Sequence, residues 1–275
     1  QIKSVIADGS HVKKGDLLYT LERPPFQAAV DVQTAAIAQA AAELENEMGG
    51  VTAVPSEASS RAVSWLWVSA RRAQRRDLLP AALRAYDRAL ELAGADPAAR
   101  RIRLLVSRAQ VRAERWDLDG ARDDAEAALA TAGSIGDRSV EAAAVLRLGD
   151  IDQRAGHTDA AIARLRRAAD GFAAEGDERG RGEALRLLGL TLLFSGDLER
   201  AAATVEEARE ALEAAGHVAG QGWAAQNRAF IALLGGDLER TESEGDRANE
   251  LFGTVSEDVG AAWSNGLLAF VRFAQ

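Results

Sequence analysis

Six glycines stand at 20-residue intervals in this chain, and each is followed directly by Asp or His. They are Gly136, Gly156, Gly176, Gly196, Gly216 and Gly236. Glycine tolerates the left-handed backbone conformation that ends a helix, and a following Asp can cap the next helix. The spacing therefore predicts helices of roughly 15 residues joined by short turns. Because one pair of such helices cannot bury its apolar stripe alone, the pairs must stack, and the fold class is mainly α, an α-solenoid of helix pairs.

The composition is consistent with helices and excludes several functions. Aromatic residues make up 5% of the chain and there are five prolines, which favours helix. The formal net charge of -9 argues against a nucleic-acid partner, since phosphate binding needs a basic surplus. There is no cysteine, so disulfides, thiolate metal sites and cysteine nucleophiles are excluded. No apolar run reaches membrane-spanning length, so we expect a soluble chain, unless a targeting segment lies outside this sequence.

A compositional boundary lies near residue 50. Lys3, Lys13 and Lys14 are the only lysines, whereas every basic side chain after Ser60 is Arg. Between the two parts, paired glycines and a proline in residues 49–56 interrupt any helix. We therefore expect an N-terminal segment over 1–48, a linker over 49–60 and a helical array over 61–275. Chance clustering of three lysines is the alternative explanation of the difference.

The N-terminal segment has the pattern strand, turn, strand, Pro-Pro, helix. Extended runs over residues 2–7 and 16–21 flank a polar turn and predict a small β-hairpin-like unit. Residues 26–48 contain no breaker and predict a single amphipathic helix.

The string from Val5 to Glu22, followed by Arg23-Pro24-Pro25-Phe26, resembles periplasmic adaptor (membrane fusion) proteins of efflux and secretion pumps. The resemblance implies the first half of a lipoyl-like domain and the start of an α-hairpin. It ends near Met48, since no returning helix or second half-domain follows. Lys13 and Lys14 match the unmodified turn of adaptors, so we expect no attached cofactor.

From residue 62 the pattern repeats every 40 residues, so the unit is a helix pair. Small residues recur in the first helix at Ala70, Ala109, Gly149, Gly189, Ala229 and Ala269. Gly149, Gly156, Ala161 and Ala168 have the spacing of tetratricopeptide (TPR) repeats, which this region resembles. The family period is usually 34, and the longer period is similar to variants in large bacterial transcriptional regulators and kinesin light chains. The resemblance implies about five helix pairs plus one terminal helix.

In such arrays the first helices line the concave face, so residues flanking the small column are the binding candidates. These candidates are Arg103, Arg147, Arg154, Arg186, Trp223, Gln226, Asn227 and Phe230. The arginines come from the earlier repeats and the aromatic residues from the later ones. A groove of this kind fits an acidic, partly apolar peptide. The alternative is that the aromatic residues are inter-repeat core and the arginines a solvated face.

The last helix, from Val259 to Ala274, is apolar around much of its circumference and no second helix follows it. We expect it to be exposed at Trp263, Leu267, Phe270 and Phe273. Because terminal repeats normally carry a polar outer face, either the chain is cut from a longer protein or this helix docks onto a second copy or another domain.

Catalytic chemistry is missing from the sequence. His11, His157 and His217 lie far apart, and the last two occupy the column of the capping aspartates. We expect them to serve the turns, with no metal and no cofactor. Phosphate-binding and dinucleotide-binding motifs are also absent.

The sequence therefore predicts a non-catalytic scaffold that binds a protein or peptide. Two alternatives remain: a sensor segment of a larger bacterial regulator that binds a small effector, and a component of a pump adaptor. A cytoplasmic location is favoured for the array and a periplasmic one for a functional adaptor segment, with only indirect membrane association. Whether residues 1–48 and 61–275 are a natural fusion stays open.

Overall fold

The computed structural model describes residues 2–5, 19–21, 57–94 and 98–274. The chain divides into two compact units, Gln1–Ala53 and Val54–Gln275. In the first unit, strands β1 (Ile2–Val5) and β2 (Tyr19–Leu21) pair antiparallel and lie within the two predicted extended runs. The helix predicted over 26–48 and residues 49–56 of the predicted linker lie outside the described residues.

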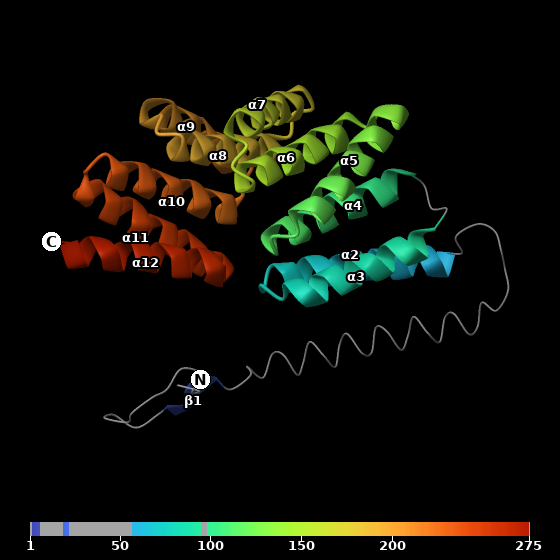
Figure 1. The fold of residues 1–275 in the computed structure, drawn as a ribbon, viewed down its shortest axis with the longest axis horizontal. Helices are drawn as coiled ribbons and strands as arrows, with labels where there is room; N and C mark the ends of the chain where they lie inside the picture. Colours follow the sequence, from blue (N-terminus) through green and yellow to red (C-terminus); the bar gives the residue numbers. More distant parts are fainter. Residues whose placement is uncertain (1, 6–18, 22–56, 95–97, 275) are drawn as a thin grey trace. The chain divides into compact units, whose positions relative to one another are not determined.

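The described part of the second unit is a succession of helix pairs, in which each first helix is followed by an antiparallel second helix (Figure 1). The pairs are α2 (Glu57–Gln74) with α3 (Leu79–Ala93), α4 (Ala98–Glu114) with α5 (Leu118–Ile135), α6 (Arg138–Arg154) with α7 (Thr158–Ala174), α8 (Glu178–Phe194) with α9 (Leu198–Ala214), and α10 (Val218–Leu234) with α11 (Leu238–Val255), followed by α12 (Asp258–Ala274). Helix α2 begins at Glu57, so the end of the predicted 49–60 linker is helical.

The glycines at 20-residue intervals end the helices as predicted. All six have positive φ, between 61° and 86°. The same position one interval earlier holds Trp116, with φ 63°, and one interval later holds Ser256, with φ 54°. The left-handed turn is therefore imposed by the repeat geometry, and two residues with side chains adopt it where the sequence supplies no glycine.

The residue after each of these turns occupies the N-cap of the next helix. Where it is Asp, its side chain accepts a hydrogen bond from the backbone N–H three residues later, as for Asp137 Oδ1 and Val140 N at 3.1 Å. The side chains of His157 and His217 make no such bond. Both histidines hold N-cap positions in the turns, as the sequence indicates, but without a side-chain cap; their rings instead lie near Asp152 and Glu183, at 3.7 and 3.4 Å.

Small residues allow the two helices of a pair to pack closely. A Cβ placed on Gly189 of α8 would lie 2.4 Å from the Val205 side chain of α9, and one on Gly149 of α6 would lie 2.7 Å from Leu165 of α7. These distances are below any normal carbon–carbon contact, so a larger residue here would force the helices apart. The two helices of these pairs thus approach each other closely at the recurring small residues of the first helix.

Ion pairs join neighbouring repeats. Arg108 of α4 donates to Asp87 of α3 and to Asp124 of α5, each at 2.7 Å. One hundred and twenty residues later, Arg228 of α10 repeats this arrangement with Glu206 of α9, at 3.7 Å, and Glu244 of α11, at 2.6 Å. Each arginine therefore links the second helix of its own pair to the second helix of the preceding pair.

The charges of such a link are reversed in the α6–α7 pair, where an acid of the first helix binds two arginines. Asp152 of α6 is almost fully buried and accepts from Arg122 of α5, at 2.7 Å, and from Arg164 of α7. A buried charge of either sign is tolerated here because the flanking helices supply two opposite charges.

The start of α12 lies beside the turn between α2 and α3 (Figure 1). Burial raises the pKa of Glu257, and the negative charges of Asp258, Glu114 and Asp77 raise it further. The first and last repeats of the array thus face each other with like charges.

Replacing Trp116 by Gly should stabilise the array by about 1 kcal/mol, because a side chain in the left-handed region costs roughly that much. Trp116 is 67% exposed, so little packing is lost. Thermal unfolding followed by circular dichroism should show a rise in midpoint. The matched control is Gly156→Ala, at the same place in the next pair, where the midpoint should fall; a lower midpoint for Trp116→Gly would contradict the assignment of strain.

Replacing Arg108 by Ala should destabilise the array by about 2 to 4 kcal/mol, because Asp124 then keeps its buried charge with only Arg112 beside it. Urea unfolding measures the loss. Arg247→Ala removes an exposed pair with Glu250 and should change the free energy of unfolding by less than about 0.5 kcal/mol. Equal effects of the two substitutions would show that the Arg108 link is not a buried one.

Candidate functional site

The first helices of the pairs form a common surface, here called the inner face. Successive members α4, α6, α8, α10 and α12 contact one another along the array. Two hollows lie on this surface, one between α2 and α4 and the other between α10 and α12. Between them lies a polar stretch on α2, α4, α6 and α8.

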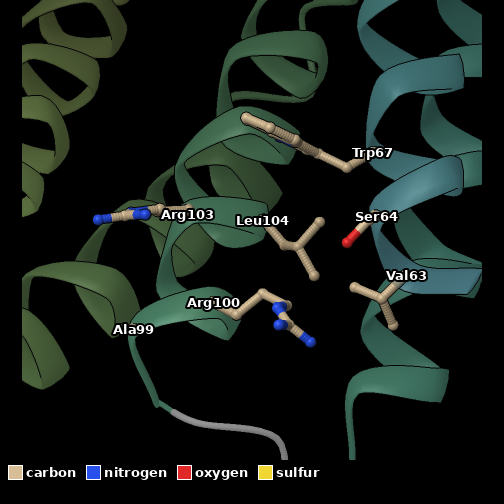
Figure 2. Close-up of a pocket in the computed structure, with 7 residues that line it drawn as sticks. All are labelled: Val63, Ser64, Trp67, Ala99, Arg100, Arg103 and Leu104. Atoms are coloured by element: carbon tan, nitrogen blue, oxygen red, sulfur yellow. The ribbon is translucent and has the colours of Figure 1, made fainter. Parts of the chain in front are cut away.

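The first hollow, called the N-terminal pocket, has a volume of about 330 Å³. Its walls are Val63, Ser64 and Trp67 of α2 and Ala99, Arg100, Arg103 and Leu104 of α4 (Figure 2). Val63 and Leu104 face each other across it, whereas Arg103 extends away at its edge (Figure 2). The pocket therefore combines an apolar floor with cationic groups at its rim.

Trp67 is held in a fixed orientation at this pocket. Its indole Nε1 donates to the Ser107 hydroxyl at 3.4 Å, and the guanidinium carbon of Arg71 lies 5.1 Å from its ring centroid. The Arg103 side chain is 63% exposed and forms a long ion pair with Asp137, at 3.8 Å. A fixed aromatic wall beside an exposed guanidinium is suited to an apolar group that carries a carboxylate.

The polar stretch next to this pocket centres on Glu114. Its carboxylate accepts from Gln74 of α2 at 3.0 Å and from Gln110 at 2.9 Å. Burial raises the pKa of Glu114 above its ordinary value, although the two amides and the charges of Arg147 and Arg154 act in the opposite direction. The two arginines are themselves paired with buried Asp150, at 4.0 and 3.0 Å.

Arg186 of α8 is also paired. It donates through Nε and Nη2 to Glu183, at 3.1 and 3.0 Å, and Glu183 also faces His217, the N-cap residue of α10. Burial opposes ionisation of Glu183, but Arg186 and His217 outweigh it and lower its pKa to about 2. The backbone carbonyl of Arg186 accepts from the Asn227 amide at 3.2 Å. This cluster ties α8 to α10 and offers little free positive charge.

The second hollow, called the C-terminal groove, is larger, about 520 Å³, and apolar. Phe230 and Leu233 of α10 line one side and Ala262, Trp263, Gly266, Leu267 and Phe270 of α12 the other. Trp263 and Phe270 are 60% and 58% exposed, so the groove presents aromatic surface to solvent.

The structure brings some of the predicted residues together and separates others. Phe230, Trp263, Leu267 and Phe270 meet in the C-terminal groove, and Arg103 lies at the N-terminal pocket. Trp223 instead packs edge-on against Phe252 of α11, the second helix of its own pair, with ring centroids 5.2 Å apart.

Gln226, Asn227 and Leu267 differ from what the sequence indicated, whereas Phe273 does not. Gln226 and Asn227 are buried, at 3% and 4% exposure, between neighbouring helices. Leu267 was expected to be exposed on the terminal helix, and this is wrong, since it is 6% exposed and forms the floor of the groove. Phe273 is 90% exposed, outside the groove.

Sequence reasoning missed the acids that neutralise the inner-face arginines. Glu183 precedes Arg186 by three residues, and Asp150 precedes Arg154 by four. Such spacings place opposite charges side by side on a helix, so the pairing signal was present. The sequence did not indicate that Val63, Leu104 and Leu233 line the two hollows, because apolar residues on these helices usually belong to the core.

The described residues offer neither a metal site nor a membrane-spanning helix. In the ranges 57–94 and 98–274 no group of three or more His, Asp or Glu side chains is placed to hold a metal ion. None of the helices described there combines the length and apolarity needed to cross a bilayer.

No protein-family model matches this sequence, and no curated protein matches it. Solved structures do match. BtubC (BKLC) from P. vanneervenii is 18% identical, with a TM-score of 0.61 over 83% of this chain and 92% of that one. A Rap protein complexed with competence and sporulation factor is 15% identical, with a TM-score of 0.59 over 90% and 72%. A putative kinesin light chain with TPR-like repeats from Podosopora anserina is 13% identical, with a TM-score of 0.51 over 73% and 99%.

These structures decide the fold class. The array is a TPR-like α-solenoid. At these identities the likeness concerns the fold of the array and not its ligand. The matching structures support the TPR-like part of the sequence interpretation and give no support to the adaptor resemblance of the N-terminal segment.

Replacing Glu183 by Gln tests the charge cluster of the TPR-like array through pH. Because the pKa of Glu183 is depressed when folded, its contribution is present above the ordinary value of 4.5 and is lost as the pH falls towards 2. Between pH 5 and pH 3 the wild type should lose about 2 kcal/mol more stability than the variant. Urea unfolding at both pH values measures the difference; parallel losses would show that Glu183 is not stabilised by its neighbours.

Proposed function

We propose that this chain is a non-catalytic scaffold that binds a protein or peptide along its inner face. The observation that carries the proposal is the C-terminal groove, where Trp263 and Phe270 are more than half exposed beside Phe230. Exposed aromatic side chains that frame an apolar hollow are typical of binding hot spots. The groove fits one or two apolar side chains of a partner.

The N-terminal pocket supplies a second point of recognition. Its rim carries Arg103, whose guanidinium is largely exposed, whereas Arg147, Arg154 and Arg186 are occupied by acids of the array. An acidic side chain or a terminal carboxylate of the partner therefore binds at Arg103, and the paired arginines act mainly as structure. The sequence predicted positive charge along the groove, whereas the charge proposed for recognition lies at Arg103, at one end of the inner face.

The polar stretch between the two hollows suits the backbone of a bound peptide, which also carries hydrogen-bond donors and acceptors. Gln74, Gln110 and Glu114 of α2 and α4 offer donors and acceptors without an apolar pocket. A peptide that anchors at both ends and crosses this stretch in an extended form satisfies all three regions. The complex of a Rap protein with competence and sporulation factor supports a binding role for this type of array.

The first test uses peptides selected from a random phage-displayed library on the full chain. We expect selected peptides to combine an apolar residue with an acidic one. Trp263→Ala should weaken their binding at least tenfold in fluorescence anisotropy, because truncating an interface anchor costs more than about 1.4 kcal/mol. Phe273→Ala, which removes an exposed aromatic of the same helix outside the groove, should leave affinity within about twofold.

The charge requirement is tested separately. Arg103→Ala should remove the preference for acidic over neutral versions of the selected peptides, whereas Arg101→Ala, also exposed on α4 but outside the pocket, should preserve it. Binding that responds to neither Trp263→Ala nor Arg103→Ala would place the site away from the inner face.

A further inference from the structure

A buried side-chain amide beside the C-terminal groove has an oxygen without a partner. Gln226 of α10 is 3% exposed, and its Oε1 finds no hydrogen-bond donor among the described residues. Gln226 precedes Phe230 by four residues and Leu233 by seven, so the three side chains share one face of α10. Phe230 and Leu233 line the groove. The unpaired oxygen therefore belongs to the groove side of α10, one helical turn before the aromatic wall.

The contacts between neighbouring first helices explain why this amide is unpaired. The carbonyl of Arg186 in α8 accepts a hydrogen bond from the Asn227 amide in α10. Arg186 stands three residues before the recurring small residue of its helix, and Asn227 stands two residues before that of the next helix. Between α10 and α12 the same two positions hold Gln226 and Leu267. Leu267 offers no polar side-chain group to Gln226, and it forms the floor of the groove.

An occupant of the groove that carries a hydrogen-bond donor would relieve this situation. A buried amide oxygen without a donor is unfavourable, because it has lost its hydrogen bonds to water and gained none from the protein. The side chain of Gln226 has three rotatable bonds, so its amide can turn towards a group that enters beside Leu267. A purely apolar occupant leaves the oxygen unpaired, and a site of this kind distinguishes side chains with a donor from those without one.

The walls of the groove decide which donor fits. Phe230 lies on one side and Trp263 and Phe270 on the other, around a volume of about 520 Å³. Aromatic rings pack favourably against one another edge to face or offset, so these walls favour an aromatic occupant. The groove-lining residues of α10 and α12 carry no charge, which disfavours the charged donors of Lys and Arg. Tyr and Trp are the aromatic side chains that combine a large ring with a neutral donor at its edge.

We propose that Gln226 determines the specificity of the C-terminal groove, which binds a Tyr or Trp side chain of the partner whose O–H or N–H donates to Gln226 Oε1. This inference rests on the proposed function, and it specifies the side chain that anchors the partner there. Phe and Leu fill similar space without a donor, so they bind more weakly at this point.

The experiment uses the full chain and the phage-selected peptides whose binding is weakened by Trp263→Ala. We expect these peptides to carry a Tyr or Trp. Synthetic versions exchange Tyr for Phe, or Trp for 3-benzothienylalanine, in which sulfur replaces the indole N–H. Removal of the donor should weaken binding about fivefold in fluorescence anisotropy, since a neutral hydrogen bond contributes roughly that factor.

Variants of the chain locate the acceptor. Gln226→Met keeps the length of the side chain and removes the oxygen, so the Tyr and Phe versions should then bind within about twofold of each other. Ser264→Ala is the matched control, because Ser264 Oγ is also buried without a partner among the described residues and does not line the groove. It should preserve the fivefold difference. Both variants remove an unpaired buried oxygen, so neither should lower the melting temperature measured by circular dichroism.

The outcomes separate this inference from the proposed function. Equal affinity of the wild-type chain for the Tyr and Phe versions would overturn the role of Gln226, whether or not the variants fold. Selected peptides that anchor through Leu or Phe would do the same, and so would a Tyr preference that Gln226→Met retains; in each case the groove still binds peptides and the proposed function stands. Peptides that bind equally well to the wild type and to Trp263→Ala would overturn both.

Discussion

The close approach of the two helices in each pair is the constraint on which the rest of the structure depends. Gly149 and Gly189 leave no room for even a methyl group against Leu165 and Val205. The left-handed turn recurs at the same place in successive pairs. Trp116 and Ser256 adopt positive φ at this place, where glycine is missing.

Charge is arranged so that the inner face is less basic than its sequence indicates. First-helix arginines pair with acids on the same helix, as Arg186 does with Glu183, or bridge to second helices, as Arg108 does. Such pairs satisfy charges that packing has removed from water. What is left for a partner is the exposed guanidinium at the N-terminal pocket and the aromatic surface at the C-terminal groove, so recognition is concentrated at the two ends of the inner face.

The fold was predictable because its signals are local. Turn glycines, capping aspartates and small columns each act within one pair, and the array repeats them. The site was only partly predictable, because exposure depends on how a helix is rotated against its neighbours. Trp223 and Phe230 lie on one helix, yet the first packs on Phe252 of α11 and the second lines the groove. Leu267 was placed on the surface, since the sequence does not reveal that α10 shelters it. The partners of Arg154 and Arg186 could have been found from their spacing.

The links made by Arg108, Asp152 and Arg228 have a consequence for cooperativity. In a repeat array each unit contacts only its neighbours, so stability is a sum of units and interfaces, and loss of structure spreads from one interface to the next. A side chain that binds both the preceding and the following second helix couples three helices at once, and none of them can then open alone. Helix α12 is tied through Arg272 to α11 only. Among the described helices, α12 should therefore open more readily than α9, α10 and α11, which Arg228 holds together.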